Sequence, residues 1–309
     1  MQDTQFELAI VIPAYNEEAF IGDTLRAIKR RLTAVSYELV VVDNGSTDRT
    51  MGVVEAEGFK VVSRPEGRIS ALRNAGVKET SADVLVFIDA DVEITDQWAG
   101  QIRGVLEELS QDAMQVTGSR YLPPDNRSWL NEHWYKPLVT IETGYINAGH
   151  LLTSRALFDR IDGFDEGLET GEDVDFCRRA EFAGARMVHR RRLAVIHHGY
   201  PATLRGFVLR EKWLGRSMLG SKTGMLAMAH VVMIALAVVG AVTSGLFAAV
   251  STYVVLVYLL CLVLSKYKFR ALGMAQAART AVVFYFYLIG RTLGLIDRMV
   301  NRGHRKRAR

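Results

Sequence analysis

The chain has 309 residues and a net charge of +4, a length that suits one large domain with an appendage. Residues 224–265 contain no Asp, Glu, Lys or Arg, and residues 266–309 carry 11 basic residues against one acid, which leaves a net charge of −6 for residues 1–223. Because the basic residues adjoin an apolar span, they favour an anionic membrane surface over a nucleic acid as partner. The only two cysteines, Cys177 and Cys261, exclude a secreted domain that is held together by disulfides.

Short apolar runs alternate with amphipathic segments over the first 90 residues. The runs predict buried strands, and the segments between them predict helices. This strict alternation predicts an α/β fold with a mostly parallel sheet and helices on both faces. The polar start of the chain contains no apolar signal region, so we expect this domain to lie in the cytoplasm. The predicted strands are 8–12 (ended by Pro13), 38–43, 60–63 and 83–88, and the predicted helices are 16–32, 49–57 and 67–77.

Two carboxylates, Asp89 and Asp91, follow the fourth predicted strand and flank Ala90. In open α/β sheets, ligands bind beyond the carboxyl ends of the strands. Two hard oxygen ligands at such a point suit Mg²⁺ or Mn²⁺, and these ions usually arrive bridged to phosphates. The same pair could instead start a loop or cap the next helix.

Several motifs in this order and spacing resemble the family 2 glycosyltransferases, which have a GT-A fold (Rossmann-like α/β) and use nucleotide-diphospho-sugars. The resemblance covers residues 8 to about 200 and implies a catalytic domain at 1–203. The motifs are 12–18 (IPAYNEE), 42–48 (VDNGSTD), 89–91 (DAD), 163–166 (GFDE) and 171–180 (GEDVDFCRRA).

The resemblance also implies roles on the donor side. Asp91 would bind a divalent metal, Mn²⁺ or Mg²⁺, that bridges the diphosphate, and Asp89 would face the ribose or the donor sugar. Asp43 would accept the N3 proton of a uracil or thymine ring, although a turn residue bonded to its own backbone fits the sequence equally well. Arg73 would face the diphosphate, the alternative being a solvated charge. The other nucleotide-sugar-binding candidates are Pro13, Ala14, Tyr15, Glu17 and Ala90.

Two acids, Glu172 and Asp173, stand at the start of a predicted helix, where the helix dipole favours their charged forms. Inverting transfer needs a general base that takes a proton from the acceptor hydroxyl. The resemblance favours Asp173 as this base and Glu172 as the residue that positions it or the acceptor, with Asp175 the weaker candidate. Acids in a first turn can also serve only as caps.

Three further features could belong either to the active site or only to the structure of the fold. His197, at the end of a predicted strand, would complete the metal site, although a histidine there is more often structural. The segment 144–150 resembles the lining of a donor-sugar pocket. Three aromatic residues could stack on a sugar, although packing in a core is their commoner role: Trp129, Trp134 and Tyr135.

The C-terminal third has the pattern of a membrane anchor. Residues 204–223 mix basic and apolar side chains, which predicts an amphipathic helix at the membrane interface. The charge-free run 224–265 is about two bilayer spans long, at about 20 residues each, and 243–245 is its natural turn. A transmembrane hairpin returns both basic flanks to one side of the membrane, as the positive-inside rule requires. A soluble helical pair is the alternative.

Residues 266–309 predict a basic interfacial helix and tail. The apolar stretch 281–296 within them contains Arg291. As a third span it would carry the terminal arginines to the outer side, against the positive-inside rule. A helix that lies in the interface therefore fits better.

These features together predict an inverting, metal-assisted glycosyltransferase on the cytoplasmic membrane, with its catalytic domain in the cytoplasm. It would move a sugar from a nucleotide-diphospho-sugar, UDP-linked by resemblance, to a lipid-linked or saccharide acceptor. One alternative is a transferase that acts on polyprenyl phosphate. An alternative of another class is a membrane protein that binds nucleotide-sugar without catalysis. The donor sugar, the acceptor, the linkage and the oligomeric state are left open.

Overall fold

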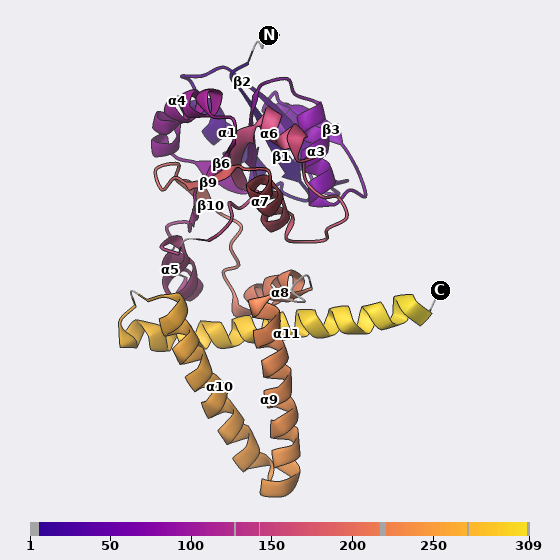
Figure 1. Cartoon of the computed structure of the whole chain (residues 1–309), viewed down its shortest axis with the longest axis vertical. Helices are drawn as coiled ribbons and strands as arrows, with labels where there is room; N and C mark the ends of the chain where they lie inside the picture. The colour runs from indigo at the N-terminus through magenta and orange to yellow at the C-terminus, as the bar shows by residue number, and fades with distance from the viewer. Residues whose placement is uncertain (1–5, 127, 142, 217–220, 271, 308–309) are drawn as a thin grey trace. The chain divides into compact units, whose positions relative to one another are not determined.

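The computed structural model describes residues 6–126, 128–141, 143–216, 221–270 and 272–307, with 301–307 as backbone only. The chain divides into two compact units (Figure 1). The α/β unit consists of Met1–Pro124 and Glu142–Tyr200, and the helical unit consists of Asp125–Ile141 and Pro201–Arg309. The sequence-based division placed residues 125–141 within 1–203, whereas their contacts group them with the C-terminal helices.

The α/β unit is built on a seven-stranded sheet with the strand order β3-β2-β1-β4-β8-β6-β9. Neighbouring strands are parallel except that β8 runs antiparallel to both β4 and β6. A separate three-stranded sheet has the order β5-β10-β7. This mostly parallel sheet with its flanking helices confirms the predicted fold class. The strands are β1 (Leu8–Ala14), β2 (Tyr37–Asp43), β3 (Lys60–Ser63), β4 (Val84–Ile88), β5 (Val92–Ile94), β6 (Gln115–Gly118), β7 (Tyr121–Leu122), β8 (His150–Ser154), β9 (Arg186–His189) and β10 (Val195–His197).

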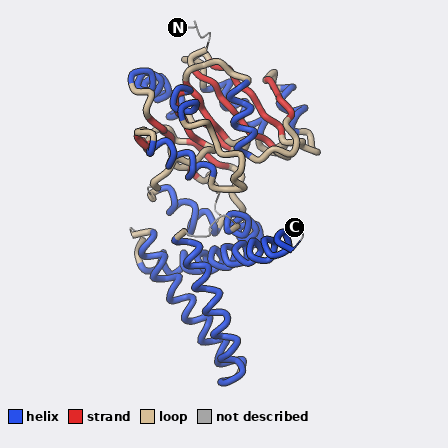
Figure 2. The backbone as a smooth tube through the Cα atoms, turned by 45° about the vertical axis from the view of Figure 1, so that its right-hand side comes forward, coloured by secondary structure: helices blue, strands red, loops and turns tan. Residues whose placement is uncertain are grey.

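Alternate residues of the central strands face two separate cores, one on each side of the sheet (Figure 2). In β1, Leu8, Ile10 and Ile12 belong to the core covered by α1 and α4, while Ala9 and Val11 belong to the core covered by α3, α6 and α7. Because both faces are covered, these strands are continuously apolar. The helices are α1 (Ile21–Arg31), α2 (Thr50–Ala56), α3 (Ile69–Lys78), α4 (Asp96–Gln111), α6 (Arg155–Arg160) and α7 (Glu172–Phe182).

Strand β1 continues through Pro13 to Ala14, so the prediction that Pro13 ends it is wrong. Over this last part β1 still pairs with β2, but its pairing with β4 is confined to Ala9–Val11. Among the described residues no strand pairs with the β4 side of β1 beyond Val11. The missing N–H of the proline therefore interrupts no ladder on that side.

The helical unit contains an apolar hairpin of α9 (Lys222–Ser244) and α10 (Leu246–Lys268), which turns at Gly245 with a φ of +83°. In the described part of the chain, three helical segments are long and apolar enough to cross a membrane: these two and Met274–Val300 of α11 (Met274–Arg307). Only 11% and 17% of the apolar windows of α9 and α10 are buried, against 56% for α11. Figures 1 and 2 show α11 running across the open end of the hairpin.

Helix α8 (Leu204–Gly215) packs closely against α11, and it is shorter than the amphipathic helix predicted at 204–223. Residues 217–220 of that prediction lie outside the described residues. A Cβ on Gly294 of α11 would lie 2.2 Å from the carbonyl oxygen of Lys212 in α8, so a larger residue would separate the two helices. Glu211 and Arg291 form an ion pair of 2.6 Å in this contact. The face of α8 that contains Glu211 therefore lies against protein.

The segment 125–141 supplies aromatic side chains to the core of the helical unit, through η1 (Asn131–Tyr135) and α5 (Lys136–Val139). Trp134 and Tyr135 are each 2% exposed. The structure therefore assigns both to core packing rather than to a sugar platform, whereas Trp129 is partly exposed. Four rings lie 5.2–5.7 Å from that of Trp134, measured between centroids: Phe207, Phe269, Phe284 and Tyr287.

Candidate active site

The carboxylates of Asp89 and Asp91 follow β4 at its carboxyl end, on either side of the buried Ala90. The Asp89 N–H donates to the carbonyl of Gly149 at 3.0 Å, and the Asp91 carbonyl accepts the N–H of His198 at 2.9 Å. These bonds hold the pair between the segments that flank β8 and β10. Helix α4 is capped by Thr95, whose hydroxyl accepts the N–H of Trp98. The acidic pair therefore does not cap the next helix.

Arg73 joins Asp89, which follows β4, to Glu172 in the first turn of α7. Its Nη2 donates to Asp89 Oδ1 and its Nη1 donates to Glu172 Oε1, both at 2.8 Å. The arginine is 1% exposed, so it is not a solvated charge. Burial acts to lower the pKa of Arg73, but the charges of Asp89 and Glu172 raise it above its ordinary value. Its terminal nitrogens thus contact carboxylates, where the sequence led us to expect a diphosphate.

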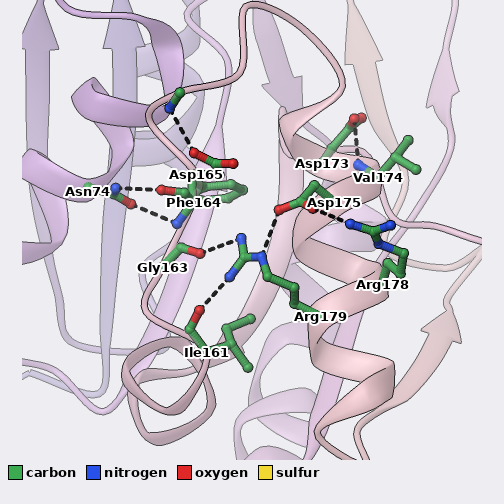
Figure 3. A network of polar contacts seen from close by, with 11 residues as sticks. Asn74, Ile161, Gly163, Phe164, Asp165, Asp173, Val174, Asp175, Arg178 and Arg179 are labelled. Atoms are coloured by element: carbon green, nitrogen blue, oxygen red, sulfur yellow. Dashed lines mark hydrogen bonds and ion pairs between the residues drawn. The ribbon is translucent and has the colours of Figure 1, made fainter. Parts of the chain in front are cut away.

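Glu172 and Asp173 occupy the first turn of α7, after Gly171 with a φ of +81°. Burial, reinforced by the charge of Glu172, raises the pKa of Asp173 to about 7. Asp175 lies differently: it forms ion pairs with Arg178 at 2.9 Å and Arg179 at 2.7 Å. Figure 3 shows Asp175 between these two arginines, with the Asp173 carboxylate pointing away from them. Asp175 therefore supports α7, and Asp173 is the acid suited to proton transfer.

His197 lies at the end of β10, and its Nε2 is 3.6 Å from Asp91 Oδ2. A carboxylate and an imidazole this close together could both bind one divalent cation. Within the described residues, no group of three or more His, Cys, Asp and Glu side chains could hold a metal. Such an ion would take its remaining ligands from phosphate oxygens and water.

The residues predicted on the nucleotide side differ in their burial. Pro13, Ala14 and Ala90 are buried, while Tyr15 is 55% exposed. Burial, followed by the charges of Asp91, Asp89 and Asp48, raises the pKa of Glu17 to about 7. Glu17 is thus close enough to the acidic pair to be influenced by it.

Asp43 is fully buried at the end of β2. Its Oδ2 accepts the N–H groups of Gly45 and Ser46, both at 2.9 Å, and its Oδ1 accepts the Ser46 hydroxyl. The alternative of a turn residue bonded to its own backbone is therefore what the structure shows. Asp43 would therefore influence a bound base indirectly, by fixing the conformation of this turn.

Residues 9–164, half of the chain, match the family model described as Glycosyl transferase family 2. The chain belongs to this family. The prediction of a glycosyltransferase is thus confirmed, and the three apolar C-terminal helices suggest that the enzyme is associated with a membrane.

Curated relatives of this glycosyltransferase match over part of their length. The pre-mycofactocin glycosyltransferase of Mycobacterium tuberculosis is 25% identical over 230 residues, 68% of this chain and 46% of that protein. The dolichol-phosphate mannosyltransferase of Pyrococcus furiosus is 29% identical over 167 residues, 51% of this chain and 45% of that protein. The chain spans about half the length of the curated relatives it matches.

Among solved structures, the mannosyltransferase PcManGT from Pyrobaculum calidifontis, in complex with GDP-Man and Mn²⁺, has a TM-score of 0.58 and 16% identity. The match covers 95% of this chain and 88% of that chain. At this identity the likeness shows the fold alone, and it agrees with the predicted GT-A architecture.

Tyr121 in β7 belongs to the site of the glycosyltransferase but was not predicted. Its ring centroid is 4.9 Å from that of His197, and its hydroxyl donates to Asn147 Oδ1 at 2.5 Å. A Cβ on Gly149 would lie 2.2 Å from the Tyr121 hydroxyl and 1.9 Å from Asp89 Oδ2. Tyr121 thus connects His197 to the segment that faces Asp89. A two-residue strand has no periodicity by which the sequence could reveal it.

The enzyme holds the segment 144–150 through α7 as well. The N–H of Ile146 donates to the sulfur of Cys177 at 3.3 Å, one helical turn after Asp173. The second histidine, His198, instead bonds Glu93 at 2.9 Å. Of the two histidines, His197 is therefore the one that faces Asp91.

Proposed function

We propose that this glycosyltransferase is an inverting enzyme that moves a sugar from a nucleotide-diphospho-sugar to an acceptor hydroxyl at a membrane surface. The observation that carries the proposal is the Arg73 bridge between Asp89 and Glu172. It places the start of α7, with a carboxyl group of raised pKa, beside the acids that end β4. One site thus has a donor side and an acceptor side.

Asp173 is the proposed general base. An acid with a pKa of about 7 is a stronger base than an ordinary aspartate and is still about half ionised at pH 7. It takes the proton of the acceptor hydroxyl as the oxygen attacks the anomeric carbon and the nucleoside diphosphate departs. Glu172, held by Arg73, keeps the first turn of α7 in place.

Asp91 and His197 would hold a divalent metal, Mg²⁺ or Mn²⁺. A carboxylate oxygen and an imidazole nitrogen that lie 3.6 Å apart are ligand types that such an ion accepts. The Mn²⁺ of the mannosyltransferase with the similar fold supports this assignment. When bound, the metal supplies charge stabilisation to the departing diphosphate.

The donor is proposed to be a UDP-sugar, on the resemblance that the 42–48 motif carries. Asp43 would shape the turn that faces the base, with Pro13, Ala14, Tyr15 and Glu17 bordering the nucleotide and Ala90 between the two acids. A screen of nucleotide-sugars for metal-dependent thermal stabilisation tests this, because a ligand that binds the folded state stabilises it by mass action. If GDP- or dTDP-sugars stabilise the protein and UDP-sugars do not, the proposal of a UDP-sugar donor is wrong.

We propose that residues 1–203 work in the cytoplasm and that 224–265 anchor them as a transmembrane hairpin, with 204–223 and 266–309 at the interface. The exposed apolar surfaces of α9 and α10 and the course of α11 across their open end support this arrangement. A helix that crosses the open end of a spanning hairpin lies along the membrane plane. Labelling of a C-terminal cysteine from outside intact cells would contradict it, whereas protection agrees with it.

The acceptor is proposed to be lipid-linked or a saccharide held near the membrane. A second candidate is transfer directly to polyprenyl phosphate, which the dolichol-phosphate mannosyltransferase among the relatives favours. Offering polyprenyl phosphate and a lipid-linked sugar in parallel separates the two. The catalytic assignments are tested together by Asp91→Ala and Asp173→Asn, each expected to abolish transfer by a folded protein.

A further inference from the structure

The loop 161–166, between α6 and α7, is held by two polar side chains from neighbouring helices (Figure 3). Asn74 of α3 pairs with both backbone groups of Phe164: its Oδ1 accepts the N–H at 2.9 Å and its Nδ2 donates to the carbonyl at 2.8 Å. Arg179 of α7 donates to the carbonyls of Ile161 and Gly163. Gly163 has a φ of +60°, and a Cβ there would lie 2.8 Å from Asn74 Oδ1. The loop backbone is thus fixed next to α3.

One side of this loop borders open space. A cavity of about 670 Å³ lies there, lined by residues that include Asn74, Gly163, Phe164 and Arg179. Asp91 and Asp173 are not among the residues that line this cavity. On this side the hydrogen bonds of Asn74 and Arg179 hold the loop backbone, and removing them would leave the loop held by the packing of Phe164.

What the loop presents to the site is the ring of Phe164. The ring stacks on Phe176 of α7 with centroids 4.5 Å apart and meets Phe87 of β4 edge-on at 5.1 Å. The ring also contacts Arg73, whose guanidinium carbon lies 5.5 Å from the ring centroid. A guanidinium at this distance from an aromatic face is attracted by the ring quadrupole. Phe164 therefore contacts β4, α7 and the arginine that joins Asp89 to Glu172.

We propose that Phe164 is a positioning residue for sugar transfer: held by Asn74 and Arg179, its ring fixes the guanidinium of Arg73 between the donor-side and acceptor-side acids. The inference rests on the proposed role of Asp173 as base. It assigns a function to the 163–166 motif, whose glycine forms the turn and whose phenylalanine forms the contact.

The charges around Asp173 make this positioning measurable. Glu172 on the same helix raises the pKa of Asp173, and Arg73 from α3 lowers it. The remaining acid in contact with Arg73 is Asp89 after β4. A guanidinium that is free to move away from Asp173 would oppose its protonation less, so the acid limb of the rate profile should move to higher pH.

The test compares Phe164→Leu with Phe158→Leu in the full chain. Phe158 belongs to the same aromatic cluster, with its centroid 5.8 Å from Phe87 and 6.0 Å from Phe176, and its ring is not among those found under Arg73. Both substitutions remove a ring from the same core and keep an apolar side chain, so both should lower thermal stability.

For Phe164→Leu we expect kcat to fall about tenfold, less than the 100-fold that about 1 Å of misplacement costs. The midpoint of the acid limb should rise by about half a pH unit. Phe158→Leu should leave that midpoint in place. An unchanged midpoint for Phe164→Leu, or an equal shift for both variants, would overturn the proposal.

A second substitution keeps the proposal testable if Phe164→Leu does not fold. Asn74→Ala leaves the ring intact and removes the two bonds to the Phe164 backbone, so it should move the midpoint in the same direction by a smaller amount. No movement with full binding of the donor would count against the proposal. Asp173→Asn separates this inference from the proposed function: if that variant transfers sugar normally, the base assignment fails whatever Phe164 does.

Discussion

Replacing Arg73 with methionine removes the only charge that the structure places between Asp89 and Glu172 in this bridge. The side chain of Arg73 is 2% exposed, and those of Asp89 and Glu172 are 26% and 13% exposed. Methionine fills much of the same space, so the main effect is that two partly buried carboxylates lose their partner. Removing one member of a buried ion pair costs about 3–5 kcal/mol.

Because Asp89 keeps contact with water, we expect the lower end, about 3 kcal/mol of unfolding free energy. For a unit of this size the loss corresponds to a fall in Tm of about 6–12 °C. The assay is thermal unfolding of the full chain in nanodiscs at pH 7.

The matched control is Glu172→Gln, alone and combined with Arg73→Met. The double variant lacks one of the two charges left unpaired in the single variant, so it should recover about 1 kcal/mol or more. An Arg73→Met protein that unfolds within about 2 °C of wild type would refute the reasoning. So would a double variant that is less stable than Arg73→Met.

Three further predictions concern the site. Since Asp173 must be ionised to act as base and its pKa is about 7, kcat should rise with pH through about 7 and level off above it; a pH–rate profile with no change between pH 6 and 8 would contradict this. Gly149→Ala should weaken donor binding strongly, because its Cβ would lie 1.9 Å from Asp89 Oδ2, whereas Gly144→Ala, with open space around its Cβ, should bind nucleotide-sugar normally in calorimetry. His197→Ala should weaken Mn²⁺ binding about tenfold or more in a titration followed by EPR, and unchanged affinity would remove His197 from the metal site.

The inner strands β1 and β4 of the donor half could be predicted from the sequence because they are buried on both faces. A continuous apolar run bounded by polar turns predicts a strand there, and the predicted strand 83–88 begins one residue before β4. The prediction that Pro13 ends β1 was wrong because the effect of a proline depends on whether a neighbouring strand pairs with its missing N–H. Which strands pair there is decided by the order of strands in the sheet, and the local sequence pattern does not contain that order.

The site residues show the same limit. Motif spacing predicted that Arg73 and Glu172 matter, but the contact between them joins residues that are 99 positions apart, so it appears only in the fold. Tyr121 was missed for a related reason: its role comes from where β7 lies beside β10. The membership of 125–141 in the helical unit likewise depends on aromatic contacts with helices far along the chain.

The most direct test of the central claim is a rapid-quench single-turnover measurement with Asp173→Asn in the full chain, with donor and metal saturating. If Asp173 takes the acceptor proton, the variant should bind the donor with wild-type affinity while the rate of transfer falls by about 10²–10⁴-fold. A transfer rate within about threefold of wild type, with the donor bound normally, would contradict the account.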